Sequence, residues 1–420
     1  MHKLSKRLEQ NHKPNQTELD LFMNIKTKFK SFIAAALFST VSNVVAANTV
    51  DSTMLAPMAS VEDAKMSFRD LPYLQESFID LTPAAREDQL AVGELGVDSG
   101  TKDEIIKLAK EVANDKHGLY DSMLISHQGK LLFESYYKRG RVNLHHGQAS
   151  ATKAYTSMAL GRAIQLGYLT MADLQKPLIS FLKDLDTSKL AEGSEKITLH
   201  KALTMHGGLS IDRDKWQELK KNPAAIKGQL LVQALLEHSA PITSESQQYL
   251  YGNYNPILVM AVIDAVVPGS AENFLKKEIL DKLGITNYTW KTHVSGIPEA
   301  GWGVNMTSRD MVKLGTVVLN KGKWQGEQLI SANYLVKATS SLVKPTEDWM
   351  PDNFRYGYFW YQTDITVGDK SYDATFAWGG GGQRIIVVAA LDLIIVITGH
   401  EREDKIFTQI SERVIPAFIE

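Results

Sequence analysis

The sequence predicts an α+β fold in which both ends of the chain build one β-sheet and a helical segment is inserted between them. Apolar segments with strand patterning occur at residues 122–134 and again at 383–398. Helical periodicity predominates between Ser150 and about Trp290. Strands at both ends that enclose a helical middle are typical of one sheet domain with an all-helical insertion.

The first 47 residues have the order of a secretory signal peptide. Residues 24–30 are basic, residues 31–45 are uncharged and mostly apolar, and small residues end the stretch at Ala47. Because Met23 directly precedes this stretch, residues 1–22 are interpreted as an over-extended start and 23–47 as the signal peptide. A membrane anchor is the alternative, but the uncharged run is short and rich in Ala, Ser, Thr and Asn.

Cleavage after Ala47 would give a periplasmic or secreted protein with no stable membrane insertion. It would leave 39 Lys and Arg against 45 Asp and Glu, a net charge of −6, and no basic run. This balance gives no support for a nucleic-acid partner. The chain has no Cys, and its 11 His include neither His-x-His nor His-Glu-x-x-His. We therefore expect no disulfide, no metal and no cofactor.

The elements of the N-terminal half follow in order. Residues 48–100 have mixed composition with scattered prolines, and we interpret them as an N-terminal extension that packs on the body or is partly disordered. Residues 104–113 have helical periodicity. The segments 122–126 and 130–134 flank His127-Gln-Gly129, which predicts a β-hairpin.

The C-terminal end adds two buried strands, 383–389 and 393–398, and an amphipathic helix at 404–419. Together these elements define one domain over residues 101–420. Its sheet part is expected at about 101–145 and 290–420, and its helical part at about 146–289.

The first helix of the helical part begins at Gln148-Ala-Ser-Ala-Thr-Lys153 and is expected to end at Gly167. Residues three apart share a helix face, so the Lys153 ammonium can lie close to the Ser150 hydroxyl. An N–H in the first turn has no helical acceptor, so that of Ser150 can face an oxyanion. Ser-x-x-Lys can therefore supply a nucleophile, its activating partner and half of an oxyanion hole.

Spacing alone does not single out Ser150. The same Ser-x-x-Lys spacing begins at Ser99, Ser135, Ser180 and Ser341. Ser135 lies in strand-like sequence, Ser180 near the end of a helical stretch, and the other two in polar, loop-like sequence. Only Ser150 opens a long helix rich in small residues. The alternative is an N-cap serine beside a solvated lysine.

Two further features could carry chemistry. Tyr251-Gly-Asn253 offers a phenol, which a nearby ammonium would push towards phenolate, and an amide that can both donate and accept. Residues 377–383, Ala-Trp-Gly-Gly-Gly-Gly-Gln, run into a strand, and such a glycine strip could supply the second oxyanion N–H. An aromatic loop packed on the core and a simple strand bend are the respective alternatives.

The order Ser-x-x-Lys, Tyr-x-Asn, glycine-rich strand resembles the serine β-lactamase-like hydrolases. This family includes class C β-lactamases, D-alanyl peptidases, related esterases and 6-aminohexanoate-dimer hydrolase. The resemblance covers most of residues 101–420 and rests on four segments: 148–153, 197–209 (Ile-Thr-Leu-His-Lys-Ala-Leu-Thr-Met-His-Gly-Gly-Leu), 306–315 (Met-Thr-Ser-Arg-Asp-Met-Val-Lys-Leu-Gly) and 379–383. It implies a β-lactamase-like fold, an antiparallel sheet flanked by helices with an inserted all-helical subdomain.

The resemblance also implies roles for single residues. Ser150 would be the nucleophile, Lys153 its activating partner and Tyr251 a proton shuttle. Asn253 would position Lys153 and the substrate. The N–H groups of Ser150 and Gly380 would form the oxyanion hole, and Gly379 and Trp378 would border the substrate.

At one motif the sequence departs from the family pattern. The Lys/His-Thr/Ser-Gly motif, which helps to hold a substrate carboxylate, corresponds here to Ala377-Trp378-Gly379. An exported esterase or amidase with a small-molecule substrate is therefore favoured over a true β-lactamase. A D-amino-acid or peptidoglycan peptidase and a catalytically silent binding or sensor module are the alternatives. Whether Lys153 or Tyr251 is the operative base stays open.

Overall fold

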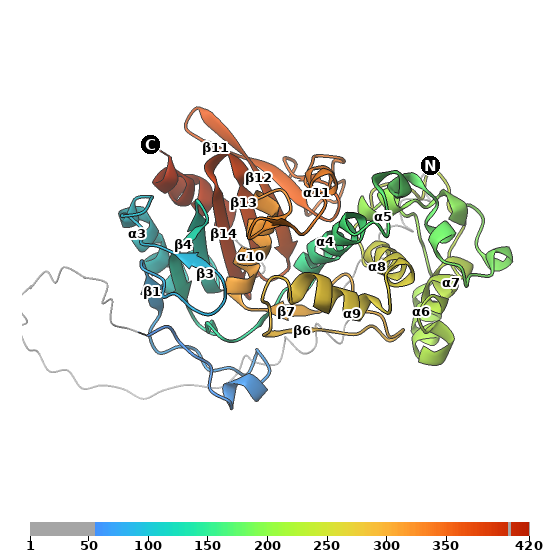
Figure 1. Ribbon diagram of the computed structural model, residues 1–420, viewed down its shortest axis with the longest axis horizontal. Helices are drawn as coiled ribbons and strands as arrows, with labels where there is room; N and C mark the ends of the chain where they lie inside the picture. Colours follow the sequence, from blue (N-terminus) through green and yellow to red (C-terminus); the bar gives the residue numbers. More distant parts are fainter. Residues whose placement is uncertain (1–54, 402–404, 420) are drawn as a thin grey trace, which may run out of the picture. The chain divides into compact units, whose positions relative to one another are not determined.

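A nine-stranded sheet forms one part of the structure, a computed structural model that describes residues 55–401 and 405–419 (Figure 1). The predicted start, signal peptide and cleavage site in residues 1–47 lie outside the described residues. The strand order is β1-β4-β3-β14-β13-β12-β11-β10, with β2 paired to β4. The strands are β1 Phe78–Asp80, β2 Ala91–Val92, β3 Tyr120–His127, β4 Lys130–Tyr136, β10 Arg355–Tyr356, β11 Tyr361–Val367, β12 Lys370–Gly379, β13 Gln383–Val388 and β14 Leu393–Gly399.

Strands from the two ends of the chain meet at the centre of this sheet. β14 pairs antiparallel with both β13 and β3, and β3 and β4 form the predicted hairpin. Every residue of β3 and β14 is buried. Both faces of the sheet centre are therefore covered, which explains why these strands read as nearly continuous apolar runs. Helix α10 (Ser308–Leu319) packs against β3, β13 and β14, and α3 (Lys102–Ala113) packs against β3.

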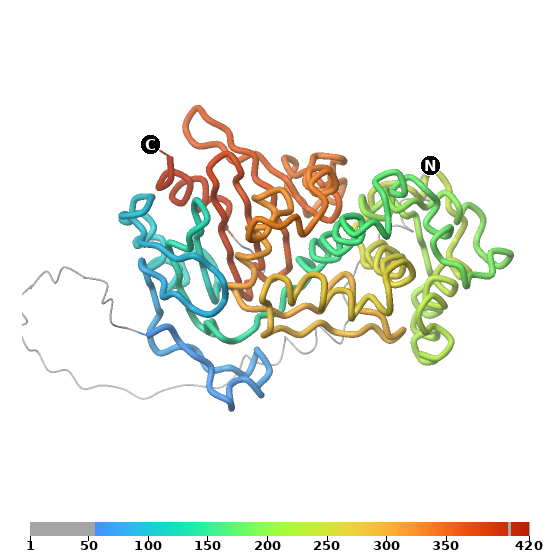
Figure 2. The backbone as a smooth tube through the Cα atoms, in the orientation of Figure 1, coloured from blue at the N-terminus to red at the C-terminus, as the bar shows by residue number. Residues whose placement is uncertain are grey.

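The helical part lies between β4 and the C-terminal strands in the sequence, as predicted. Its helices are α4 Thr152–Gln165, α5 Leu199–Leu203, α6 Arg213–Lys220, α7 Leu230–Glu237, α8 Tyr254–Val266 and α9 Ala271–Leu275. Helix α4 begins beside the large sheet and extends into the helical part, where it packs against α8 (Figure 2). The chain turns out of α4 at Gly167, whose φ of 80° favours glycine and confirms the predicted C-cap.

A small sheet connects the two parts. Its strands, in the order β5-β7-β6, are His146–Gly147, Val304–Met306 and Tyr288–Trp290. Between the small sheet and β10 the chain forms α10, a hairpin of β8 (Lys323–Trp324) and β9 (Glu327–Gln328), and helix α11 (Ala332–Ala338). The predicted α+β class, an antiparallel sheet with a helical insertion, is confirmed.

The structure adds detail in three regions. Strands β10 to β12 lie in the predicted sheet part, but no individual strands were predicted there; in β11 and β12 buried residues alternate with more exposed ones. β1 and β2, within the predicted N-terminal extension, pair with β4 in the large sheet, so this segment packs on the body, one of the two outcomes expected for it. The final helix is α only at α12 (Ile406–Gln409), then widens to a π-turn and tightens to a 3₁₀ turn at Pro416, which has no N–H to continue an α-helix.

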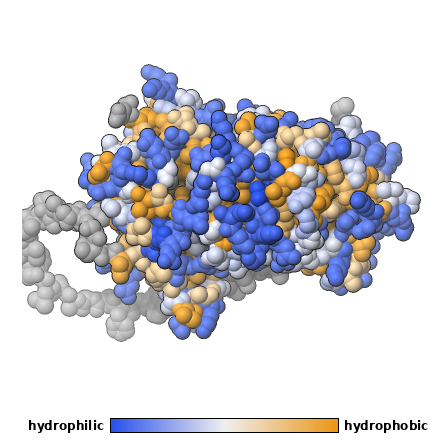
Figure 3. Space-filling model, in the orientation of Figure 1, coloured by the Kyte–Doolittle hydropathy of each residue, from blue (hydrophilic) through white to orange (hydrophobic). Residues whose placement is uncertain are grey.

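The face shown in Figure 3 mixes hydrophilic and hydrophobic residues without a continuous apolar band. Within the described residues no single helix has the length and apolar composition of a membrane span. Among residues 55–401 and 405–419, one pair of helices, 254–266 and 271–280, has both when combined, but it bends by 88°.

A buried ion cluster fastens the extension to the sheet. The Arg309 guanidinium, on α10, donates to the carboxylates of Glu134 on β4 and of Asp88 in the extension. The Tyr136 hydroxyl also donates to Glu134. Since removing one partner of a buried pair leaves a charge without compensation, these residues depend on one another.

A second buried cluster surrounds Asp121 on β3. Its Oδ2 lies 3.2 Å from His146 Nε2 and 2.9 Å from His400 Nδ1, and Oδ1 accepts the N–H of Arg139. Burial acts to raise the pKa of this carboxyl. The hydrogen bonds and charges of His146 and His400 outweigh burial, and the pKa falls to about 2.

The ionised Asp121 should therefore stabilise the fold. Because its pKa is lower in the folded state, this stability is present above the ordinary value of 3.8 and is lost as the pH falls towards 2. We expect Asp121→Asn to lower the free energy of unfolding at pH 7 by about 2 kcal/mol. Urea unfolding between pH 2.5 and 7 measures this. The exposed Asp115→Asn is the control, and equal effects of the two substitutions would contradict the prediction.

Candidate active site

Ser150 lies in a single 3₁₀ turn, Ala149–Ala151, that leads directly into α4. It therefore precedes the α-helix by one turn, while keeping the predicted spacing to Lys153. All residues from Thr152 to Ala163 are buried. The small side chains of this helix allow that close packing, as the sequence indicated.

Lys153 is the centre of the site. Its side chain is only 1% exposed, and Nζ donates to Ser150 Oγ at 3.2 Å and to the carbonyl oxygen of Gly301 at 2.9 Å. The same ammonium lies 4.8 Å from the ring centroid of Tyr251. A buried ammonium needs such partners, because transfer out of water penalises the charged form. The structure thus brings Ser150, Lys153 and Tyr251 together.

The backbone before Ser150 is held by Gln148, which is fully buried. Its N–H donates to Val304 O, its amide nitrogen donates to His146 O, and its amide oxygen accepts the Tyr155 hydroxyl. The next residue, Ala149, has a φ of 44°, a left-handed conformation that costs a non-glycine residue about 1–2 kcal/mol. The bonds of Gln148 maintain this strained turn, which sets the direction of Ser150.

The end of β12 packs against this turn. A β-carbon at Gly379 would lie 2.1 Å from the Gln148 carbonyl oxygen, so only glycine allows the approach. Gly380 follows the strand, and a β-carbon there would meet nothing within 4 Å. Its N–H has no hydrogen-bond acceptor among the described residues. The predicted oxyanion donor therefore has no acceptor within the described residues, and the preceding residue, Gly379, packs on the turn that carries Ser150.

Tyr251 is positioned by a loop of the sheet part. Its N–H donates to Glu347 Oε1 at 2.8 Å, and its ring packs edge-on against Trp349 at 5.5 Å between centroids. Tyr361 lies close enough to form a side-chain hydrogen bond with it. Burial, and then the neighbouring phenols, raises the pKa of Tyr361 well above its ordinary value. Tyr361 therefore stays protonated beside Tyr251.

Asn253 takes a different position from the one expected. The structure shows no hydrogen bond between Asn253 and Lys153 within residues 55–401 and 405–419. Its Oδ1 instead packs over Gly301, where a β-carbon would come within 2.5 Å of it. The Gly301 carbonyl thus takes the lysine contact that was predicted for Asn253. The exposed Asn253 side chain borders open space beside the site, and a role in substrate binding stays a prediction.

Trp378 lies next to Gly379 in β12, with Ala377 fully buried beside it. The Arg384 guanidinium lies 4.7 Å from the Trp378 ring centroid, and Nη1 donates to the carbonyl oxygens of Gly379 and Gln383. The sequence analysis did not identify Arg384. The one feature that could have marked it is a charged residue within an otherwise apolar strand. Trp378 also packs on Trp349, at 5.6 Å between centroids.

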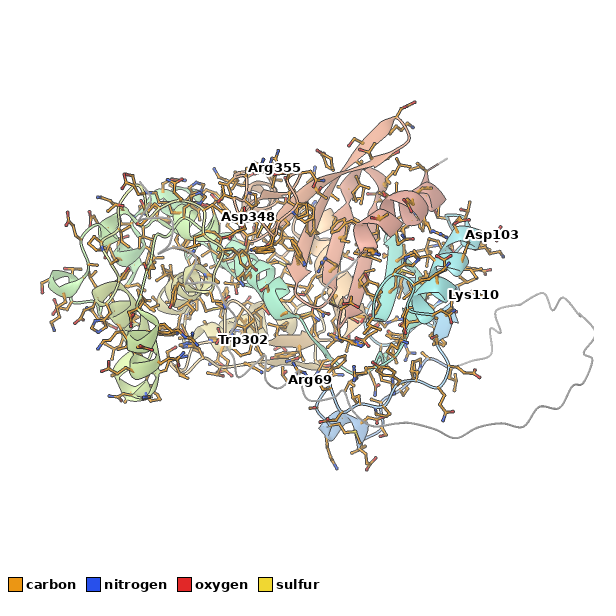
Figure 4. The ribbon with its side chains drawn as sticks, turned by 180° about the vertical axis from the view of Figure 1, so that it is seen from behind. Arg69, Asp103, Lys110, Trp302, Asp348 and Arg355 are labelled. Atoms are coloured by element: carbon orange, nitrogen blue, oxygen red, sulfur yellow. The ribbon has the colours of Figure 1, made fainter. Side chains whose placement is uncertain are left out.

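Two cavities border these residues. The first, about 510 Å³, is lined by Trp349, Phe354, Trp378, Arg384 and Phe407, among others. The second, about 570 Å³, includes Asn253 and Trp302. Trp302 and Asp348 lie in the region between the helical part and the large sheet (Figure 4). In the part of the chain that the structure describes, no group of three His, Asp or Glu side chains is placed to hold a metal ion.

Comparison with known proteins identifies related folds. The family model described as "Beta-lactamase" matches residues 107–405. No curated protein matches the chain. Solved structures with a similar fold include a provisionally assigned 6-aminohexanoate-dimer hydrolase from Bacillus anthracis (18% identity, TM-score 0.56, covering 81% of this chain and 90% of that one). A D-stereospecific amidohydrolase from Streptomyces sp. (15%, 0.54, 72% and 97%) and a class C beta-lactamase (14%, 0.54, 76% and 95%) are also similar.

The contact between Gly379 and Gln148 can be tested by adding one carbon. We expect Gly379→Ala to lower the free energy of unfolding by about 3 kcal/mol, since the backbone carbonyl that it meets cannot move aside cheaply. Gly380→Ala is the matched control and should change stability by less than about 0.5 kcal/mol, because its β-carbon enters open space. Denaturant unfolding of both variants measures this. Equal stability of the two would show that β12 does not press on the turn.

Proposed function

The chain belongs to the beta-lactamase family, and we propose that it is a serine hydrolase that cleaves an ester or amide through an acyl-enzyme on Ser150. The observation that carries this proposal is the 3.2 Å hydrogen bond from a buried Lys153 ammonium to the Ser150 hydroxyl. A serine needs a neighbouring base to become a nucleophile, and Lys153 is placed for this role.

The reaction proceeds in two acyl-transfer steps. Ser150 Oγ attacks the carbonyl carbon while Lys153, neutral in the reactive form, or the Tyr251 phenolate accepts its proton. The oxyanion forms against the N–H groups of Ser150 and Gly380, where each donor is worth about 3–4 kcal/mol. The leaving group then departs with a proton delivered through Tyr251. Water attacks the ester on Ser150, and the reverse proton transfers release the acid and restore the hydroxyl.

The surroundings of Trp378 favour an ester or amide substrate over a β-lactam. Ala377 is buried and carries no charge where the family pattern has a cation. Arg384 lies nearby, but its guanidinium packs over Trp378 and donates to backbone carbonyls. The large Trp378 ring suits an apolar group, and the adjoining 510 Å³ cavity adds both aromatic and polar side chains, Asp364 among them.

Two alternative functions differ from the proposed esterase or amidase activity. A D-amino-acid or peptidoglycan peptidase agrees with the names of two fold relatives, the D-stereospecific amidohydrolase and the penicillin-binding protein homologue from Pyrococcus abyssi. Trapping by a penicillin would support it. A catalytically silent binding or sensor module would form no covalent adduct with any acylating agent.

We also propose that the protein is exported after cleavage at Ala47. The support is the order of basic, apolar and small residues in 23–47. N-terminal sequencing of the secreted or periplasmic product is the test, and a product that retains residues 23–47 would contradict it.

Covalent labelling tests the nucleophile. A fluorophosphonate should add one adduct to the wild-type protein and none to Ser150→Ala. Ser180→Ala is the control, because Ser180 has the same Ser-x-x-Lys spacing and should label normally. Intact-mass spectrometry reads the adduct, and a panel of short to long p-nitrophenyl esters reads turnover. A folded wild-type protein without an adduct would make the binding module the leading hypothesis.

The proton-transfer residues make a second prediction. Lys153→Met and Tyr251→Phe should each lower kcat for a p-nitrophenyl ester by about 10²- to 10⁴-fold, the usual range for a general base or acid. Lys183→Met, which changes the lysine of the Ser180 motif, should have no such effect. Thermal unfolding of each variant separates a lost proton transfer from a lost fold. Full activity in Lys153→Met would exclude Lys153 as the activating partner.

A further inference from the structure

The second cavity, of about 570 Å³, carries two lysines on aromatic rings. We call it the lysine cavity, and its residues used below are Trp216, Lys220, Asn253, Lys291, Glu299 and Trp302. Lys220 Nζ lies 5.6 Å from the Trp216 ring centroid, and Lys291 Nζ lies 4.9 Å from that of Trp302. Each ammonium is therefore held above a flat apolar surface inside a concave space.

The lysine cavity adjoins the proposed nucleophile. Asn253, in its wall, packs on Gly301, whose carbonyl accepts the Lys153 ammonium. Trp302 follows Gly301 directly in the chain. The buried Glu299 of the same wall interacts electrostatically with both Lys153 and Lys291. A substrate bound at Ser150 can thus extend past Asn253 into this space.

The two lysines are available to an anion. Neither ammonium forms an ion pair or a hydrogen bond with any described residue. The acid in the cavity is Glu299, whose pKa is raised by burial, against the lowering effect of Lys153 and Lys291. Burial, and then Lys220, lowers the pKa of His293, so this histidine is neutral at pH 7. Two positive charges therefore face at most one negative charge.

We infer that the lysine cavity binds a carboxylate carried by the substrate, so that the enzyme prefers esters or amides with an anionic end. This inference rests on the proposed function. It assigns acid recognition to Lys220 and Lys291 in place of Ala377, where the family pattern has its cation. In the bound substrate, the rings of Trp216 and Trp302 pack against the apolar part that joins its carboxylate to the scissile bond.

Kinetics with charge-matched esters test the preference. One pair differs on the acyl side, p-nitrophenyl hydrogen glutarate against p-nitrophenyl methyl glutarate. The other differs on the leaving group, the butyrate esters of 4-hydroxybenzoate and of methyl 4-hydroxybenzoate. The lysine cavity can receive either the acyl side or the leaving group of the substrate, so we expect the preference in one of the two pairs. In that pair kcat/KM for the anionic ester should exceed that for the neutral ester by about five- to tenfold, and the difference should fall with added salt.

Substitution of the lysines should remove this preference. In Lys220→Gln/Lys291→Gln the ratio of anionic to neutral kcat/KM should fall to about one, and in Lys291→Glu it should invert. Lys215→Gln is the control, because Lys215 lies on the same helix as Lys220 but pairs with Glu218 at the surface. Turnover of neutral esters with ratios near one in both pairs, unchanged by substitution, would overturn the inference and leave the proposed function intact.

Binding without catalysis tests the inference separately. Trp216 and Trp302 lie in the cavity, so the protein's tryptophan fluorescence can be titrated with hexanoate, hexanol and hexylamine, none of which can be hydrolysed. Hexanoate should bind about five- to tenfold more tightly than hexanol, and only in proteins that keep both lysines. Equal binding of hexanoate and hexanol would overturn the inference, whatever the protein's activity.

Discussion

The close approach of β12 to the backbone carbonyl of Gln148 is the constraint on which the rest of the site depends. No side chain fits between Gly379 and that oxygen. The approach places Gly380, with its unoccupied N–H, next to the turn that carries Ser150. Gln148 in turn bonds to three elements, and these bonds hold the strained Ala149 in place. The turn at Gln148 and the end of β12 therefore fix the positions of the two N–H groups proposed as oxyanion donors.

The buried Lys153 follows from this arrangement. An ammonium that is 1% exposed is tolerated because the Gly301 carbonyl, the Ser150 hydroxyl and the Tyr251 ring replace its water. The same principle governs the other buried charges of the chain. Asp121 has two histidines, and Arg309 has two carboxylates. Each of these clusters joins segments that are distant in sequence, so charge compensation also fixes the relative positions of the elements.

The distribution of charge around the site bears on its substrate. Positive charge is absent at Ala377 and present at Lys220 and Lys291, in a cavity that also borders Asn253. Arg384, whose guanidinium lies 4.7 Å from the Trp378 ring centroid, donates to backbone carbonyls of its own hairpin. Two cavities of different character therefore adjoin these residues, one that combines aromatic and polar side chains and one that carries the Lys220 and Lys291 ammonium groups.

The sequence by itself determined the features that depend on neighbouring residues. The hairpin at 122–134, the Ser150–Lys153 spacing and the Gly167 cap each follow from periodicity or from the preference of one residue. Only the tertiary structure decided that the lysine binds the Gly301 carbonyl, 148 residues away, and that Asn253 packs over Gly301 instead. A backbone carbonyl is chemically the same at every residue, so no sequence pattern marks the one that a distant ammonium will reach.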